Sequence, residues 1–274
     1  MKPRIAISFL LPMCLAAHLH AQLNTPKVGI VRYSDNSLHL VSGLRDDFIV
    51  SEQALGSANL ASFSDSGGLI AKTGRIELIG PDSSVIAEYD SAESAPVLNM
   101  DGSLTSAVAW LPTSHTLVHW NGSLFVKTAV LTNLPGPVTA VRIDSPTTAK
   151  LLVTENGGEV SEATISLEYG SLIALDLVPA ATGAAFAQSS FVLFHDEHGL
   201  EIATRSGALR TLSLTAPDLT IERMSSDWLH LASATAKQDW ILHLTPTALE
   251  LSELPAPSAT HLASSTSSLP EAQK

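Results

Sequence analysis

Residues 59–90, NLASFSDSGGLIAKTGRIELIGPDSSVIAEYD, hold four short apolar runs separated by three turns. The turns carry Gly, Pro, Asp and Ser, which supply positive φ angles, fixed φ angles and side-chain hydrogen bonds to the backbone. The third run, residues 75–79, alternates polar and apolar side chains as a half-buried strand does. Four strands joined by tight turns predict one blade of a β-propeller.

The same plan recurs along the rest of the chain. Each set has three or four apolar runs, and Asn121-Gly122 between two of them is a strong hairpin signal. The expected strands are 28–33, 37–41, 48–51, 59–63, 68–71, 75–79, 84–89, 106–110, 116–120, 123–127, 139–143, 150–154, 160–167, 172–178, 184–187, 191–194, 200–204, 209–214, 219–224, 228–232, 240–244 and 249–254. No long segment keeps a helical period, so the fold class is all-β.

These sets predict a β-propeller of six blades. Five blades would follow if one short set is not a blade, and seven if the irregular stretch 128–178 holds further strands. The competing architectures are a β-sandwich and a solenoid, which also contain many short strands.

One segment resembles a known repeat. Phe63-Ser64-Asp65-Ser66-Gly67, followed by an apolar run, is similar to the Phe-Ser-Pro-Asp-Gly repeat of TolB-type, WD40-like β-propellers, although Asp65 replaces the Pro and Ser66 the Asp. Residues 224–232 and 99–102 resemble the same repeat more distantly. The resemblance covers two or three blades and implies the propeller fold. Because TolB-like propellers bind other envelope proteins, it also implies a binding role.

The N-terminus predicts export. Lys2 and Arg4 precede an apolar run, residues 5–17, that is shorter than the about 20 residues of a membrane-spanning helix. We expect a signal peptide over residues 1–21, a propeller domain over 22–254 and a disordered tail over 255–274, rich in Pro, Ala, Ser and Thr. Cys14, the single cysteine, lies inside the signal peptide, so the mature chain has no disulfide. These features indicate a bacterial protein of the periplasm or the extracellular space.

Composition excludes several classes of partner. A net charge of −12 disfavours nucleic acid and anionic lipid surfaces. Aromatic residues make up 5% of the chain, too few for the aromatic girdles of a membrane barrel, so we expect no membrane insertion. We expect a monomer that needs no cofactor.

No local motif for a serine hydrolase, a zinc protease, a phosphate-binding loop or an EF-hand is present. The densest polar cluster is His195, Asp196, Glu197 and His198, two imidazoles and two carboxylates of the kind that bind divalent metals. A solvated hairpin tip explains the same residues, so the metal site stays a weak candidate and no catalytic residue is assigned.

Two imidazoles offer a further candidate surface. His115 and His119 are four residues apart, a spacing that places side chains on one face of a strand. Ordinary strand packing explains them equally, and the four tryptophans are expected in blade cores or rims.

Two functions remain open. The first is a non-enzymatic, exported propeller that serves as a scaffold for an envelope or extracellular protein or polymer. The alternative is a propeller enzyme, a lactonase or a glycan hydrolase or lyase, with an acidic site at the channel mouth. The lack of catalytic motifs leaves enzyme activity uncertain and favours the scaffold.

Overall fold

The structure is a computed structural model that describes residues 25–44, 47–183, 185–187, 191–196, 199–204, 208–214, 216, 218–245, 247 and 249–256. The predicted signal peptide lies outside these residues, as does the predicted tail from residue 257 onward. Residues Glu197 and His198 of the candidate metal cluster also lie outside them.

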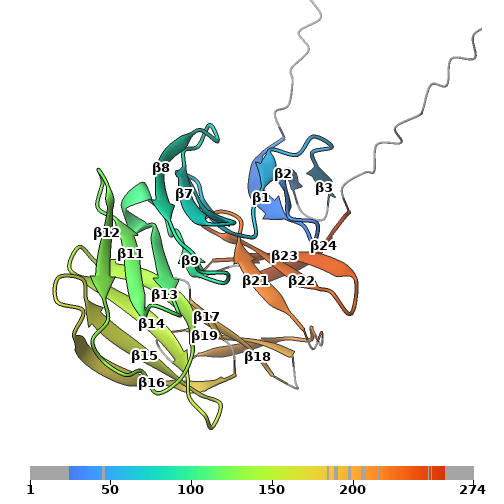
Figure 1. The fold of residues 1–274 in the computed structure, drawn as a ribbon. Coiled ribbons are helices and arrows are strands. Elements are labelled where there is room, and N and C mark those ends of the chain that lie inside the picture. Colours follow the sequence, from blue (N-terminus) through green and yellow to red (C-terminus); the bar gives the residue numbers. More distant parts are fainter. Residues whose placement is uncertain are drawn as a thin grey trace, which may run out of the picture.

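The described chain folds into six antiparallel sheets arranged around a central axis (Figure 1). The first three blades are β1 (Lys27–Arg32), β2 (Ser37–Leu44), β3 (Asp47–Val50) and β4 (Gly56–Ser57); β5 (Leu60–Ser64), β6 (Gly67–Lys72), β7 (Arg75–Ile79) and β8 (Val85–Asp90); β9 (Val97–Asn99), β10 (Val108–Leu111), β11 (Thr116–Trp120) and β12 (Phe125–Ala129). The last three are β13 (Val138–Ser145), β14 (Thr148–Thr154), β15 (Glu159–Ser166) and β16 (Leu172–Thr182); β17 (Ala185–Ala187), β18 (Phe191–Asp196), β19 (Gly199–Thr204) and β20 (Leu209–Leu212); β21 (Thr220–Arg223), β22 (Trp228–Ser233), β23 (Gln238–Leu244) and β24 (Leu249–Leu254). The all-β, six-bladed prediction is confirmed.

Buried apolar side chains hold neighbouring blades together. The described core divides into six clusters, and each joins two adjacent blades around the ring. The four tryptophans pack in or against these clusters, which confirms their predicted structural role. Each blade therefore depends on its neighbours, as repeat units do.

Two strands and one short helix were not predicted. The innermost strand of the third blade, β9, is only three residues long and shows no alternation, and it is followed by a 3-10 helix, η1 (Leu104–Ser106). In the first blade β4 has two residues, and both β3 and β4 pair with β2. The irregular stretch 128–178 contains three strands of the fourth blade and the start of its last strand, β16, and both β13 and β15 are eight residues long.

The ring closes where the first blade meets the last. Ile30 donates its backbone N–H to the Met224 carbonyl at 3.2 Å, and the Ser225 hydroxyl donates to the Val28 carbonyl at 2.7 Å. Gly29 lies between these bonds, and a Cβ atom placed there would be 2.5 Å from the Met224 carbonyl oxygen. Only glycine permits this close approach between β1 and the segment that follows β21.

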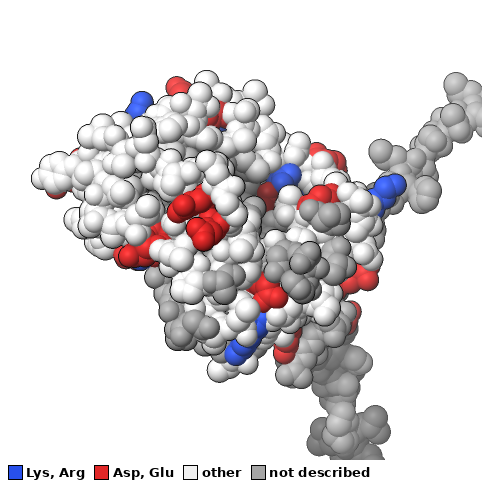
Figure 2. Space-filling view, turned by 90° about the horizontal axis from the view of Figure 1, so that it is seen from below, with Lys and Arg blue, Asp and Glu red and all other residues white. Residues whose placement is uncertain are grey.

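Among the described residues, no helix has the length and apolar character to cross a membrane. The face shown in Figure 2 carries scattered acidic and basic side chains on a mostly uncharged surface. Acidic residues outnumber Lys and Arg by 27 to 15 over the whole chain.

Candidate binding site

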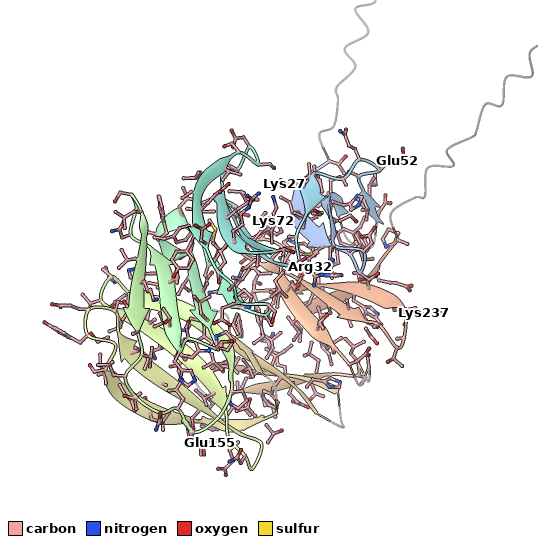
Figure 3. The ribbon with its side chains drawn as sticks, viewed as in Figure 1. Lys27, Arg32, Glu52, Lys72, Glu155 and Lys237 are labelled. Carbon is pink, nitrogen blue, oxygen red and sulfur yellow. The ribbon has the colours of Figure 1, made fainter. Side chains whose placement is uncertain are left out.

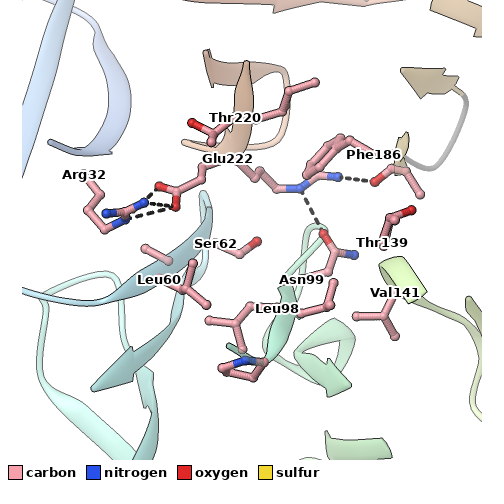
Figure 4. Close-up of a pocket in the computed structure, with 17 residues that line it drawn as sticks. Arg32, Leu60, Ser62, Leu98, Asn99, Thr139, Val141, Phe186, Thr220 and Glu222 are labelled. Carbon is pink, nitrogen blue, oxygen red and sulfur yellow. Dashed lines mark hydrogen bonds and ion pairs between the residues drawn. The ribbon is translucent and has the colours of Figure 1, made fainter. Parts of the chain in front are cut away.

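The central channel is lined by the first strand of every blade. Its cavity has a volume of about 230 Å³ and a wall that is more apolar than polar. The lining residues are Arg32, Leu60, Ala61, Ser62, Pro96, Val97, Leu98, Asn99, Thr139, Ala140, Val141, Phe186, Ala187, Thr220, Ile221, Glu222 and Arg223 (Figure 4).

An ion pair lies on the channel wall at the junction of the first and last blades. The Arg32 guanidinium donates to both carboxylate oxygens of Glu222, at 3.0 and 3.1 Å from Nε and 2.5 Å from Nη2 (Figure 4). Burial raises the pKa of Glu222, and the bond to Arg32 opposes that shift. The two charges therefore compensate each other inside the protein.

Arg223, the last residue of β21, is the largest fully buried side chain among the described residues. Its guanidinium donates to Asn99 Oδ1 at 3.3 Å and to the Ala187 and Ser226 carbonyls at 3.4 Å. It also lies 3.4 Å from Asp101 Oδ1 and 5.6 Å from the centre of the Phe186 ring. Burial lowers the pKa of Arg223, and the negative charges of Asp101 and Asp227 oppose that shift.

Asn99, the last residue of β9, faces Arg223 across the channel. The residue is 2% exposed, and its Oδ1 accepts the Arg223 bond. Its Nδ2 is buried and has no hydrogen-bond partner in the described part of the chain. An unpaired buried amide donor of this kind is destabilising.

A second cavity opens beside the channel, between the first and last blades. We call it the seam cleft. It has a volume of about 470 Å³ and shares Arg32, Thr220 and Glu222 with the channel. Its remaining walls carry hydroxyl, carboxylate, amide and ammonium groups together with two rings and two alanines: Tyr33, Ser34, Asp218, His230, Ala232, Ser233, Ala234, Lys237, Gln238 and Asp239.

Hydrogen bonds hold the acidic side chains of the seam cleft. His230 Nε2 lies 2.7 Å from Asp239 Oδ1. Asp218 accepts bonds from the Ser233 hydroxyl and, at 2.8 Å, from the Thr235 backbone N–H, and these bonds lower its pKa. Burial, and to a lesser degree the field of Asp239, raises the pKa of Tyr33 well above its usual value.

The carboxylates that line the two cavities all have a hydrogen-bond partner. Glu222 is bound by Arg32, Asp239 by His230, and Asp218 by Ser233 and Thr235. A pair of catalytic carboxyl groups needs one member to be free to take up or release a proton. Among the described channel-lining residues, Glu222 is the one carboxylate.

The metal candidates lie elsewhere in the ring. His195 is in β18, and its Nε2 is 3.3 Å from the Leu214 carbonyl oxygen, while Asp196 ends the same strand. No described group of three or more His, Cys, Asp or Glu side chains has metal-binding geometry. Because Glu197 and His198 are not among the described residues, the metal site stays a prediction.

The two histidines of the second predicted surface, His115 and His119, occupy different environments. His115 precedes β11 with a φ of 49°, and its ring lies 5.8 Å from that of Trp110. His119 is within β11, half-buried beside Trp120 in a pocket between the third and fourth blades. Burial lowers the pKa of His119 below its usual value, because the charged ring loses solvation.

Sequence reasoning did not find Arg32, Asn99, Glu222 or Arg223. They come from three blades, and no local spacing connects them. A usable signal was their position, because Arg32, Asn99 and Arg223 each end the first strand of a blade.

The comparisons with known proteins agree with the fold. No protein-family model matches the chain, and no curated protein matches it. Solved structures similar to it include virginiamycin B lyase from Staphylococcus aureus, at 13% identity over 86% of both chains with a TM-score of 0.46. The lectin of Aleuria aurantia matches at 12% identity over 85% of this chain and 93% of that one, with a TM-score of 0.49.

A third similar structure is the WD40 β-propeller domain of Doa1, at 10% identity over 78% of both chains with a TM-score of 0.46. The six four-stranded sheets of the described chain confirm, at the level of the fold, the predicted resemblance to WD40-like propellers. These similar structures include both a lyase and a WD40 domain.

Proposed function

We propose that this chain is an exported, non-enzymatic β-propeller of the bacterial periplasm or extracellular space that binds a hydroxylated polymer in the seam cleft. The observation that carries the proposal is the chemistry of the cleft wall. Asp239, Gln238, Lys237 and Ser34 place donors and acceptors around one cavity, with the Tyr33 ring beside them.

Such a wall favours a polar, hydrated ligand. Protein-binding hot spots are usually apolar or aromatic pockets with desolvated centres, and the seam cleft has few apolar side chains. Sugar hydroxyls both donate and accept hydrogen bonds, and they match a wall that mixes carboxylates, an amide and an ammonium group. The cleft carries both signs of charge, which favours a neutral polymer over a strongly charged one.

The hydrogen bonds that the carboxylates of the cleft already accept support ligand binding rather than hydrolysis. Each carboxylate of the cleft already accepts a strong hydrogen bond from a neighbouring residue. The His230–Asp239 pair is the observation that favours the enzyme alternative, because an imidazole oriented by a carboxylate can act as a general base.

Affinity electrophoresis of the protein in gels containing dextran, mannan or alginate tests the proposal. We expect at least one neutral polysaccharide to retard the protein, and the double variant Lys237→Ala/Gln238→Ala to lose that retardation. The matched control is Lys27→Ala/Gln53→Ala, since both residues are exposed on the first blade. Figure 3 labels Lys27 and Lys237 far apart on the molecule.

Three results would overturn the proposal. Equal migration of the protein in all gels would show that it binds none of these polysaccharides. A stoichiometric protein cross-linked to the wild type, and lost from the double variant, would make the cleft a protein-binding site. Release of new reducing ends from a retarding polysaccharide, abolished by His230→Gln, would establish an enzyme.

A further inference from the structure

A third cavity opens between the third and fourth blades, and we call it the interblade pocket. Its volume of about 410 Å³ is within the range of small-molecule sites, and its wall is more apolar than polar. The lining residues are Ser103, Thr105, Ser106, His119, Trp120, Asn121, Ile143, Ser145, Pro146 and Leu167. No Lys, Arg, Asp or Glu is among these described residues, whereas the channel and the seam cleft both contain the Arg32–Glu222 pair.

The His119 ring faces this pocket from β11. Side chains alternate along a strand, so His119 shares its face with Leu117 and not with Trp120. Leu117 packs in the core between the third and fourth blades, whereas Trp120 packs in the core between the second and third. Ile143 and Leu167, which line the pocket, contact the same core as Leu117. The imidazole therefore lies where this core ends and the pocket begins.

The two ring nitrogens of His119 differ in their surroundings. Nδ1 is buried and has no hydrogen-bond partner in the described part of the chain. Nε2 also has no partner there, but it is not one of the buried unpaired atoms, so it is accessible from the pocket. The neutral ring carries hydrogen on one nitrogen only. Because a buried N–H without an acceptor is rarer in proteins than an incompletely paired acceptor, we place this hydrogen on Nε2.

The hydroxyl groups of the wall already have hydrogen-bond partners. Ser103 Oγ lies 2.9 Å from Thr105 Oγ1, and the Ser106 hydroxyl donates to the Ser103 carbonyl at 2.6 Å. Ser145 Oγ lies 2.7 Å from Thr148 Oγ1. The imidazole N–H lacks such a partner, so a ligand that brings an acceptor would meet an unused donor.

We propose that the interblade pocket binds a small, uncharged carbonyl compound. Its carbonyl oxygen accepts the hydrogen bond of His119 Nε2, and its apolar body lies against Ile143, Pro146 and Leu167. A carboxylate or an ammonium group would lose its hydration in this pocket and gain no opposite charge from the wall. The pocket shares no residue with the seam cleft, so this site is independent of polymer binding there.

Isothermal titration calorimetry at pH 7 with acetophenone, benzoate and benzylamine tests the preference for a neutral ligand. All three carry a phenyl ring, but acetophenone is uncharged, benzoate is an anion and benzylamine is a cation. We expect acetophenone to bind and the two charged compounds to bind at least about tenfold more weakly. Absence of acetophenone binding, or equally tight binding of a charged compound, would overturn the proposal.

Nitrogen NMR of protein labelled with ¹⁵N in histidine tests the donor. A ring nitrogen that carries hydrogen and one that does not give well-separated signals, and the His119 signals are those that its variants lose. We expect the hydrogen on Nε2 in the free protein, and a shift of the Nε2 signal when acetophenone is added. Hydrogen on Nδ1, or an Nε2 signal that acetophenone leaves unchanged, would contradict the assignment.

Two variants with side chains of similar length isolate the hydrogen bond. His119→Gln keeps an N–H donor and should bind acetophenone within about threefold of the wild type, whereas His119→Met removes the donor and should bind it about tenfold more weakly. His243→Phe is the matched control, because His243 is in the last blade and stacks on Trp228, a contact that phenylalanine also makes. Equal binding by the Gln and Met variants would rule out the hydrogen bond, and the NMR spectra of the wild type decide the same question if a variant does not fold.

Discussion

Arg32 and Glu222, which are 190 residues apart in the sequence, form a bidentate ion pair that separates the central channel from the seam cleft. In the part of the chain that the structure describes, the first and last blades exchange no strand. Their contact consists of this pair, the hydrogen bonds from Ile30 and Ser225, and the cluster around Val31 and Met224. The same residues thus contribute to ring closure and to both candidate sites.

Removing one partner of the ion pair should lower the free energy of unfolding more than replacing both partners. Removing one partner leaves a buried charge without compensation, whereas exchanging both for apolar side chains of similar volume is often neutral. We expect Arg32→Met and Glu222→Leu each to lower the free energy of unfolding by about 3 kcal/mol, and the double variant to lose much less. Urea denaturation of the four proteins measures this coupling.

If the loss in the double variant equalled the sum of the losses in the two single variants, the expectation would be contradicted. They would mean that water reaches the isolated charge in each single variant and compensates it. The pair's side chains are 17% and 14% exposed, which limits such access.

Gly29 should not tolerate a larger residue. In Gly29→Ala the new methyl group would lie 2.5 Å from the Met224 carbonyl oxygen, so the first blade must move away from the last. We expect a loss of about 1–3 kcal/mol in the free energy of unfolding. The matched control is Gly157→Ala, at a position with no atom within 4 Å of the added Cβ, and a loss of equal size there would exclude the steric explanation.

The fold could be predicted because each blade carries its own turn and strand signals. Residues 59–90 contain a complete blade, and the expected strand 75–79 coincides with β7. The strand β9 was not predicted, because three residues are too few to show a period of two. Its place is set by pairing with β10 and by packing against other blades, which local sequence does not encode.

The candidate site could not be predicted for a different reason. Arg32, Asn99 and Arg223 meet only when the ring closes, and their partners come from blades far away in the sequence. The local cluster that sequence did single out, around His195, is on the second strand of its blade, and the channel wall there is formed by Phe186 and Ala187 of the first strand. Clustering along the chain was therefore a poor guide to clustering in space.

The clusters between blades should dominate stability. Leu151 is fully buried between the third and fourth blades, whereas Leu131 is 77% exposed. We expect Leu151→Ala to lower the free energy of unfolding by about 2–5 kcal/mol and Leu131→Ala to change it by less than about 0.5 kcal/mol. Thermal and urea denaturation compare the two, and similar losses at both positions would contradict the packing shown here.

The hydrogen bonds of Asp218 should make stability depend on pH in the acid range. Bonds from Ser233 and Thr235 hold its pKa in the folded protein below the usual value of 3.8. A lowered pKa means that the unfolded chain binds the proton more tightly, so this contribution is present above about pH 4 and is lost as the pH falls through the folded pKa. We expect Asp218→Asn to lower the Tm at pH 7, and its difference from the wild type to shrink between pH 4 and pH 2. Melting curves across that range check the sign, and a difference that stayed constant with pH would show that the bonds do not favour the charged carboxylate.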